Sequence, residues 1–246
     1  MDLYDELLFT PASKFQLSAE GLDVPLDHSN LISKAYQLIQ SKAVNIQTEY
    51  SIHLTKNIPL GGGLGGGSSN AAATLNALNA LWGLNLNSET LENLGKELGA
   101  DVPFFICGGV QLIEGIGEFL AHQNSKALIN LYFLLIIPSF HISTHWAYKA
   151  LNKTLQPDKS YSKFPPLSKP MKWELFDNDF ERVIRKTYPE IGKIKENLQS
   201  AGALYAGLSG SGSTVFGVFG NQQKAEALLG NFSPYQTFLS SPVFRL

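Results

Sequence analysis

The chain has 246 residues, 44% hydrophobic and 16% charged, with a formal net charge of −2. This charge argues against nucleic acid or an anionic membrane as a partner, and the longest apolar run, residues 131–137, is too short for a membrane helix of roughly 20 residues. The single cysteine excludes an intrachain disulfide framework, and the five scattered histidines give no metal site. The acidic start, MDLYDELLF, does not resemble a secretory leader, so we expect a cytoplasmic protein.

The first half of the chain is expected to hold helices on both sides of a glycine-rich loop. Apolar residues at helical spacing behind a Ser/Asn cap predict a helix over 29–40, and alternation over 45–60 predicts a strand that leads into the loop. The alanine-rich stretch after the loop predicts a helix over 68–84, and a further helix is expected over 88–99.

The second half also mixes strands with helices, which indicates α+β layers. A buried strand is predicted at 131–138 and a helix at 144–152, while the Pro/Lys/Ser-rich stretch 156–170 is typical of an exposed loop. The remaining elements expected are two helices within 177–202, a strand pair within 203–219, a helix at 221–230 and a strand at 235–241.

The glycine loop, GGGLGGG at 61–67, joins a predicted strand directly to a predicted helix and therefore indicates a ligand loop rather than a flexible linker. Glycines permit positive φ and close approach of backbone N–H groups, and a helix N-terminus attracts anions, so the pattern suits a polyphosphate. It lacks the ending of a Walker A motif and the acidic residue of a dinucleotide fingerprint. Two functions are possible for the hydroxyl groups of Ser68 and Ser69: contact with phosphate or Mg²⁺, and capping of the helix. A second loop, GLSGSGSTVFG at 207–217, is either a tight hairpin or a second wall of the same site.

Four motifs, in this order and spacing, resemble those of the GHMP kinase superfamily: PLGGGLGGGSSNAAATLNALN, GADVPFF, EGIGE and GSGSTVF. With NDFE and YPEI, they are similar to the members that act in the non-mevalonate route to isoprenoids. The resemblance covers nearly the whole chain. It implies an α+β fold with a ribosomal S5 domain 2-like domain at 1–127 and a ferredoxin-like domain at 128–246. It also implies phosphorylation, by ATP with Mg²⁺, of the 2-hydroxyl of a cytidine diphosphate-linked methylerythritol.

The resemblance further implies roles for individual residues, each with a plainer alternative. Asp101 would orient or deprotonate the acceptor hydroxyl, or merely start a turn. Asn30 would meet adenine or cap a helix, Lys56 would serve the nucleotide or be solvated, and Tyr148 would stack on cytosine or lie in the core. The implied nucleotide-binding residues are Asn30, Lys56, Pro59, Gly61, Gly62, Gly63, Leu64, Gly65, Gly66, Gly67, Ser68, Ser69, Gly210, Ser211 and Gly212. The implied substrate-binding residues are Ile116, Thr144 and Tyr148.

The start of the chain departs from the family pattern. Family members begin with a strand similar to P-A-K-I-N-L and a D-G-Y-H segment, ahead of the region that here reads LYDEL. PASKFQL at 11–17 mimics that strand but follows LYDEL, so we interpret it as a strand leading to EGLDVPLDHSNLI and Lys14 as a decoy. We assign no counterpart to the family's catalytic lysine or to its substrate-side Tyr and His. We expect either a chain that starts at an internal methionine of a longer active enzyme, which we favour, or a shortened relative of low activity.

Two alternative functions remain open from the sequence. One is another GHMP small-molecule kinase, of the homoserine or mevalonate type, and the other is a catalytically impaired nucleotide-binding fragment. The sequence leaves the oligomeric state undetermined.

Overall fold

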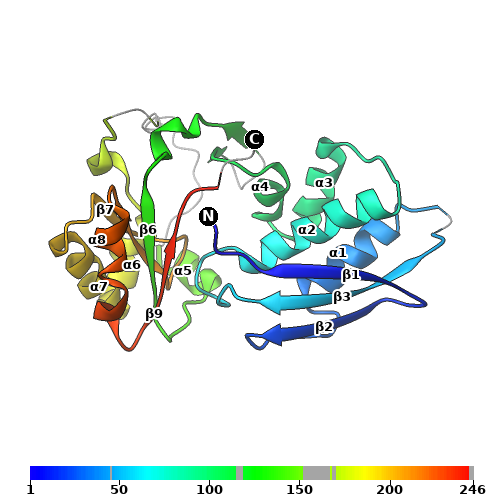
Figure 1. Cartoon of the computed structure of the whole chain (residues 1–246), viewed down its shortest axis with the longest axis horizontal. Helices are drawn as coiled ribbons and strands as arrows, with labels where there is room; N and C mark the ends of the chain where they lie inside the picture. Colours follow the sequence, from blue (N-terminus) through cyan, green and yellow to red (C-terminus); the bar gives the residue numbers. More distant parts are fainter. Residues whose placement is uncertain (45, 115–118, 152–166, 168–169, 244–246) are drawn as a thin grey trace. The chain divides into compact units, whose positions relative to one another are not determined.

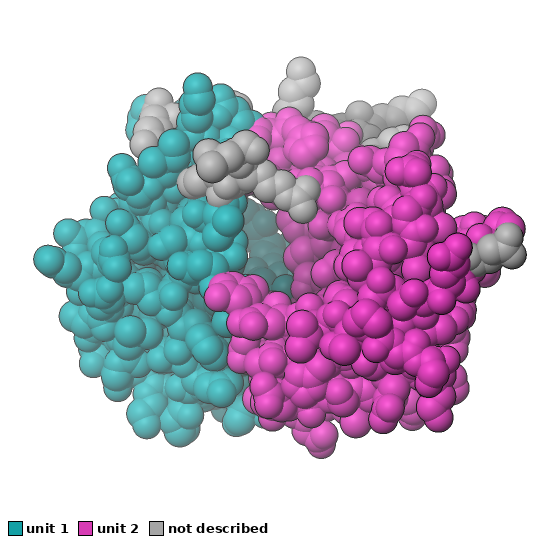
Figure 2. Space-filling view, turned by 45° about the vertical axis from the view of Figure 1, so that its right-hand side comes forward, with its two compact units in different colours: residues 1–3, 61–64, 124–246 teal, residues 4–60, 65–123 magenta. Residues whose placement is uncertain are grey.

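The computed structural model describes residues 1–246 except 45, 115–118, 152–166, 168–169 and 244–246 (Figure 1). The chain forms two compact units, coloured separately in Figure 2. The N-terminal unit comprises residues 4–60 and 65–123, and the C-terminal unit comprises residues 1–3, 61–64 and 124–246. Four residues of the glycine loop thus belong with the C-terminal unit. The domain boundary predicted after residue 127 stays a prediction.

A three-stranded sheet organises the N-terminal unit. Its strands, β1 (Glu6–Ala12), β2 (Gln16–Gly21) and β3 (Glu49–Lys56), lie in the order β1-β3-β2, with β1 antiparallel and β2 parallel to β3. The predicted alternation of β3 is confirmed, because Ile52 and Leu54 are buried while their neighbours are half-buried. PASKFQL is not one strand: it spans the end of β1, a bend with the exposed Lys14, and the start of β2, since β3 pairs with strands on both sides.

Four helices share a hydrophobic core with this sheet, and Figure 1 shows α1 and α2 across one of its faces. They are α1 (Leu31–Gln40), α2 (Gly66–Leu81), α3 (Ser88–Leu98) and α4 (Val102–Cys107). In α1 the apolar residues Ile32, Ala35, Tyr36 and Ile39 recur every three to four positions and are all buried, which confirms the predicted helix. A hairpin of β4 (Gln111–Glu114) and β5 (Phe119–His122), which the sequence did not suggest, completes the unit.

The C-terminal unit contains a four-stranded antiparallel sheet in the order β7-β8-β6-β9. Its strands are β6 (Tyr132–Ile137), β7 (Tyr205–Leu208), β8 (Val215–Phe219) and β9 (Gln236–Ser240). Numbered along the unit, this order is 2-3-1-4, as expected for a ferredoxin-like domain. Because β6 lies between two neighbours, its Leu134, Leu135 and Ile136 are almost fully buried, which confirms the buried strand predicted there.

The helices of the C-terminal unit are α5 (Thr144–Leu151), α6 (Asp179–Thr187), α7 (Pro189–Ser200) and α8 (Gln222–Glu226). Short 3-10 turns occur at Ser125–Leu128, Trp173–Leu175 and Leu229–Phe232. Pro189 separates α6 from α7 as predicted, whereas α8 ends earlier than the helix predicted at 221–230. Most of the predicted loop at 156–170 lies outside the described residues.

Candidate active site

The glycine loop has a backbone that other residues rarely adopt. Gly61, Gly63 and Gly65 have φ of +66°, +72° and +67°, so every second residue lies in the left-handed region. Gly65 caps α2 without any side-chain hydrogen bond, and α2 begins at Gly66. The serine-cap reading of Ser68 and Ser69 is therefore wrong: the helix starts two residues earlier, and the Ser69 hydroxyl donates to the Gly66 carbonyl oxygen at 2.9 Å.

The N-terminus of α2 fits a bound anion. The first N–H groups of any helix lack partners within the helix, and here no side chain caps them. The first turn of α2 contains no acidic residue, so no carboxylate competes for its positive dipole end. A 16-residue helix that opens in this way behind a glycine loop suits a polyphosphate.

The second loop, residues 209–214 between β7 and β8, contacts the first half of the glycine loop within the C-terminal unit. The Ser209 hydroxyl donates to the Gly63 carbonyl oxygen at 2.8 Å, and the Thr214 N–H donates to the Gly62 carbonyl oxygen at 3.1 Å. A Cβ at Gly63 would collide with the Ser209 carbonyl oxygen. The two glycine-containing loops singled out from the sequence are thus held together by direct hydrogen bonds.

Two of the predicted substrate residues lie beside this second loop. Thr144, the first residue of α5, has its hydroxyl 2.9 Å from the hydroxyl of Ser211. Tyr148, one turn further along α5, is 59% exposed and packs edge-on against Phe180. The core reading of Tyr148 is therefore wrong, and its ring is available to a ligand. The third substrate residue, Ile116, lies outside the described residues.

Lys56 ends β3 and is buried, not solvated. Its ammonium group forms an ion pair with Asp5, and both side chains are 1% exposed. The other oxygen of the Asp5 carboxylate accepts the N–H groups of Asn57 and Ile58, each at 2.8 Å. A Cβ at Gly66 would lie 2.9 Å from the Lys56 Nζ atom, so the ammonium group lies beside the first residue of α2. The solvated alternative is wrong, because Asp5 supplies a buried partner 51 residues away.

The remaining predicted residues of the N-terminal unit have simpler surroundings. Asn30 caps α1 through a 2.9 Å bond from the Ile32 N–H, and its amide donates to the Pro25 carbonyl oxygen at 2.6 Å. Pro59 is half-buried in the segment between β3 and the glycine loop. Asp101 is exposed in the turn before α4, and its side chain does not cap that helix. Capping of α4 therefore does not occupy its carboxylate.

Substitution of Gly63 should show how tightly the loop is constrained. We expect Gly63→Ala to lower the free energy of unfolding by at least about 1–2 kcal/mol, the cost of a left-handed alanine, because the collision with Ser209 adds to it. Gly67 is the matched control: it has room for a Cβ, 3.5 Å from the nearest atom, and lies inside α2. Gly67→Ala should therefore raise stability by up to about 1 kcal/mol. Urea unfolding of both variants checks this, and equal midpoints would contradict it.

Among the described residues, no three His, Cys, Asp or Glu side chains gather in a way that could hold a metal ion. In the same part of the chain, no helix is both long and apolar enough to span a membrane.

Comparison with known proteins identifies the family. The model of the GHMP kinases N terminal domain matches residues 30–109, and that of the GHMP kinases C terminal matches residues 159–233. The chain therefore belongs to the GHMP kinases. It is an ATP-dependent small-molecule kinase, and its fold is the α+β GHMP fold predicted from the motifs.

Individual relatives narrow this class. The chain is similar to the 4-diphosphocytidyl-2-C-methyl-D-erythritol kinase of Thermodesulfovibrio yellowstonii, with 39% identity over 96% of this chain and 84% of the relative. A crystal structure of 4-(cytidine 5'-diphospho)-2C-methyl-D-erythritol kinase superposes with a TM-score of 0.77 at 28% identity, covering 96% of this chain and 85% of that one. A homoserine kinase from Cytophaga hutchinsonii has a TM-score of 0.74 at 22% identity, covering 97% and 86% of the two chains, and shows the fold alone.

Sequence reasoning missed three residues whose side chains bond to groups in or near the two loops. Asp5 could not be found from spacing, because its partner Lys56 is distant in sequence and becomes its neighbour only through the β1–β3 pairing. Asn178 and Glu181, in contrast, lie within the NDFE motif, and the structure shows both bonded to the end of β7. In the sequence this motif indicated only the family. The folded chain shows what its side chains do.

Proposed function

We propose that this kinase transfers the γ-phosphoryl group of ATP to the 2-hydroxyl of 4-diphosphocytidyl-2-C-methyl-D-erythritol, a step of non-mevalonate isoprenoid synthesis. The observation that carries the proposal is the 39% identity to a kinase of that name across 96% of the chain. The N-terminus of α2, which no side chain caps, and the paired glycine loops support the proposal, because they fit a polyphosphate. We place this reaction in the cytoplasm.

The chain's residues would contribute mainly by positioning. In phosphoryl transfer the acceptor oxygen bonds to the γ-phosphorus, the bond from that phosphorus to the departing ADP oxygen breaks, and the acceptor proton must leave. Residues 61–69 would wrap the phosphates of ATP, and the N–H groups at the start of α2 that lack helical partners would hold phosphate oxygens. The exposed carboxylate of Asp101 would align the hydroxyl and accept its proton, since no helix-capping bond occupies it.

We include Mg²⁺ in the proposal because the chain offers oxygen atoms of the kind that bind this ion. The ion is usually held by one or two carboxylates together with substrate phosphates, and it neutralises charge on the phosphoryl group. We assign the hydroxyl of Ser68 to Mg²⁺ as an oxygen donor, and keep Asp101 for the acceptor hydroxyl. A hydroxyl oxygen is a hard ligand of the kind that Mg²⁺ prefers.

Side chains outside the two glycine-containing loops would bind the acceptor and the nucleotide. We assign Thr144 and Tyr148 to the cytidine-bearing substrate, because one hydroxyl adjoins the Ser211 loop and one aromatic ring is open to a base. Ile116 belongs to the same proposed group. Asn30, Lys56 and Pro59 are assigned to the nucleotide side.

A panel of acceptors tests this function. The purified chain is incubated with ATP, Mg²⁺ and one of 4-diphosphocytidyl-2-C-methyl-D-erythritol, homoserine or mevalonate, and ADP release and the ³¹P NMR spectrum of the product are measured. We expect phosphorylation of the cytidine compound alone. Turnover of homoserine or mevalonate instead would replace the proposal with another GHMP activity. ATP binding without turnover of any acceptor would identify an impaired nucleotide-binding protein.

A further inference from the structure

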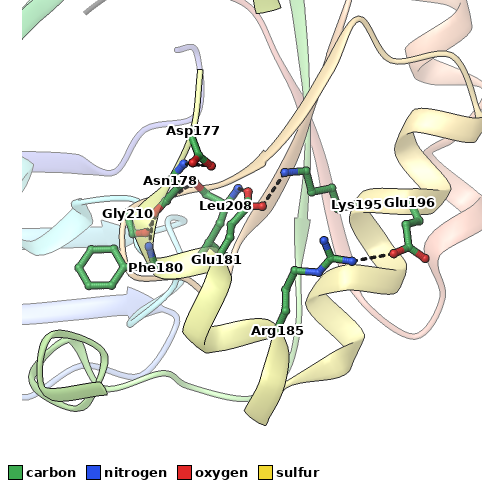
Figure 3. A network of polar contacts seen from close by, with 9 residues as sticks. All are labelled: Asp177, Asn178, Phe180, Glu181, Arg185, Lys195, Glu196, Leu208 and Gly210. Carbon is green, nitrogen blue, oxygen red and sulfur yellow. Dashed lines mark hydrogen bonds and ion pairs between the residues drawn. The ribbon is translucent and has the colours of Figure 1, made fainter. Parts of the chain in front are cut away.

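The NDFE segment, residues 178–181, opens α6 and has no task in the proposed reaction. Its spacing matches a capping box, in which the glutamate three residues after the cap bonds back to the N–H of the cap. Here the Asn178 N–H donates to the Asp177 carboxylate at 2.8 Å, and Glu181 points toward Leu208 and Lys195 (Figure 3). The glutamate is therefore used outside its own helix.

The side-chain amide of Asn178 joins α6 to the second loop. Its oxygen accepts the Phe180 N–H at 2.9 Å and caps the helix, while its nitrogen donates to the carbonyl oxygens of Leu208 and Gly210, both at 2.9 Å (Figure 3). One planar group thus makes three hydrogen bonds. Rotating the amide by half a turn would set its nitrogen against a donor and its oxygen against two acceptors, so the orientation is fixed.

Glu181 holds the same point of the chain from the other side. One carboxylate oxygen accepts the buried N–H of Leu208 at 2.9 Å, and the other accepts the ammonium group of Lys195 at 2.5 Å. The residue is 7% exposed, and a buried carboxylate is costly unless it is both paired and hydrogen-bonded, as it is here. Burial, followed by the charges of Glu181 and Asp177, raises the pKa of the neighbouring Tyr205 to about 12. Both backbone polar groups of Leu208 are consequently bound by side chains of the NDFE segment.

The second loop connects Leu208, which the NDFE segment binds, to the glycine loop. Leu208 is the last residue of β7, and the next residue, Ser209, donates to the Gly63 carbonyl oxygen. The Ser209 N–H donates to the Thr214 carbonyl oxygen at 2.9 Å, and the Thr214 N–H donates to Gly62. All of these residues belong to the C-terminal unit. Hydrogen bonds on both sides of the Leu208–Ser209 peptide bond therefore connect the first turn of α6 to Gly62 and Gly63.

We propose that Asn178 and Glu181 are positioning residues that fix the conformation of the glycine loop for the phosphates of ATP. Neither residue is assigned to touch the nucleotide. They act through Leu208, Ser209 and Thr214, and they pre-organise the glycine loop because the carbonyl groups of Gly62 and Gly63 are already bonded before any ligand arrives. The link to ATP rests on the proposed function, whereas the link between α6 and the loop does not.

The variant Asn178→Asp separates the two tasks of this residue. Aspartate caps helices about as well as asparagine, so α6 should be unaffected, but it cannot donate to Leu208 and Gly210. Asn221→Asp is the matched control, because Asn221 caps α8 in the same way with a 2.9 Å bond from the Lys224 N–H, and the described residues show no loop contact of its side chain. Hydrogen exchange in ATP-free protein is measured at the amides of Ser209 and Thr214. We expect it to be about tenfold faster in Asn178→Asp, from the loss of two hydrogen bonds, and unchanged in Asn221→Asp.

Glu181 is tested by a graded pair of variants. Glu181→Gln keeps an oxygen for the Leu208 N–H, whereas Glu181→Ala removes it, so exchange at the loop should be closer to wild type in the first. Glu196→Gln is the control, because Glu196 forms a comparable ion pair with Arg185 at 2.6 Å on exposed side chains, away from the loop (Figure 3). It should leave exchange at Ser209 and Thr214 unchanged.

ATP affinity, measured by calorimetry without an acceptor, completes the experiment. We expect about tenfold weaker ATP binding in Asn178→Asp and Glu181→Ala, together with a lower midpoint of urea unfolding in both, because each variant loses hydrogen bonds to the backbone of the loop. Exchange that rises only within α6 would overturn the positioning role, and altered exchange with wild-type ATP affinity would overturn its link to the nucleotide. A wild-type chain that binds no ATP would instead refute the proposed function, and exchange at the loop would still decide whether the NDFE segment positions it.

Discussion

Replacing Asp101 with asparagine is expected to lower kcat by about 10²- to 10⁴-fold, the usual contribution of a general base. Asparagine keeps the size and the turn-forming character of aspartate but cannot take a proton at neutral pH. The side chain is exposed and makes no capping bond to α4, so the folded state should be unaffected. The loss should therefore appear in kcat, with the KM for ATP nearly unchanged.

Steady-state kinetics with 4-diphosphocytidyl-2-C-methyl-D-erythritol, together with a urea unfolding curve, measures both parts of this expectation. Glu97→Gln is a suitable control, since it removes one exposed carboxylate of α3 in the same unit. It should change kcat by less than twofold. A near-normal kcat in Asp101→Asn would leave Asp101 as a turn residue only.

Replacing Lys56 with methionine is expected to destabilise the protein by about 3–5 kcal/mol, because it leaves the carboxylate of Asp5 buried without its cation. The N–H groups of Asn57 and Ile58 still bond to that carboxylate, but they carry no full charge. Such a loss is a large fraction of the roughly 5–15 kcal/mol by which domains are stable.

A double substitution identifies the charge as the cause. Asp5→Asn combined with Lys56→Met removes both charges and keeps an oxygen for the two backbone N–H groups, so it should be more stable than Lys56→Met alone. Lys96→Met, at an exposed lysine of α3, should change the free energy of unfolding by less than about 1 kcal/mol. Chemical unfolding of the three variants gives the comparison. A double variant as unstable as Lys56→Met would show that packing, not charge, dominates.

Elements with strong periodicity and a clear burial pattern were predictable from the sequence. The helix at Leu31–Gln40 and the strand at Glu49–Lys56 follow from apolar spacing, and the strand at Tyr132–Ile137 follows from an unbroken apolar run. β1 was missed because its pattern is weak: none of its residues is fully buried, and Leu8 is 64% exposed. The β4–β5 hairpin has only four residues in each strand, too few for a period to appear.

The candidate site was predictable where chemistry depends on local sequence. Six glycines in seven residues, placed between a predicted strand and a predicted helix, were enough to predict a ligand loop, and its binding of phosphate stays a prediction. Contacts between distant segments were not, since the Ser209 hydroxyl meets Gly63 across 146 residues and Lys56 meets Asp5 through strand pairing. The helix cap was mispredicted for a local reason: glycine in the left-handed region starts a helix as serine does in the extended region, and composition alone does not distinguish them.

The assignment of residues 61–64 to the C-terminal unit bears on how this protein can be divided and synthesised. A fragment that begins at residue 124 would lack Gly62 and Gly63, so the Thr214 N–H and the Ser209 hydroxyl would lose their acceptors. During translation these glycines leave the ribosome more than 140 residues before Ser209, and the first glycine loop cannot reach its final hydrogen bonding until the second has been made. The glycine loop is therefore encoded early in the chain, but its hydrogen bonding is completed late.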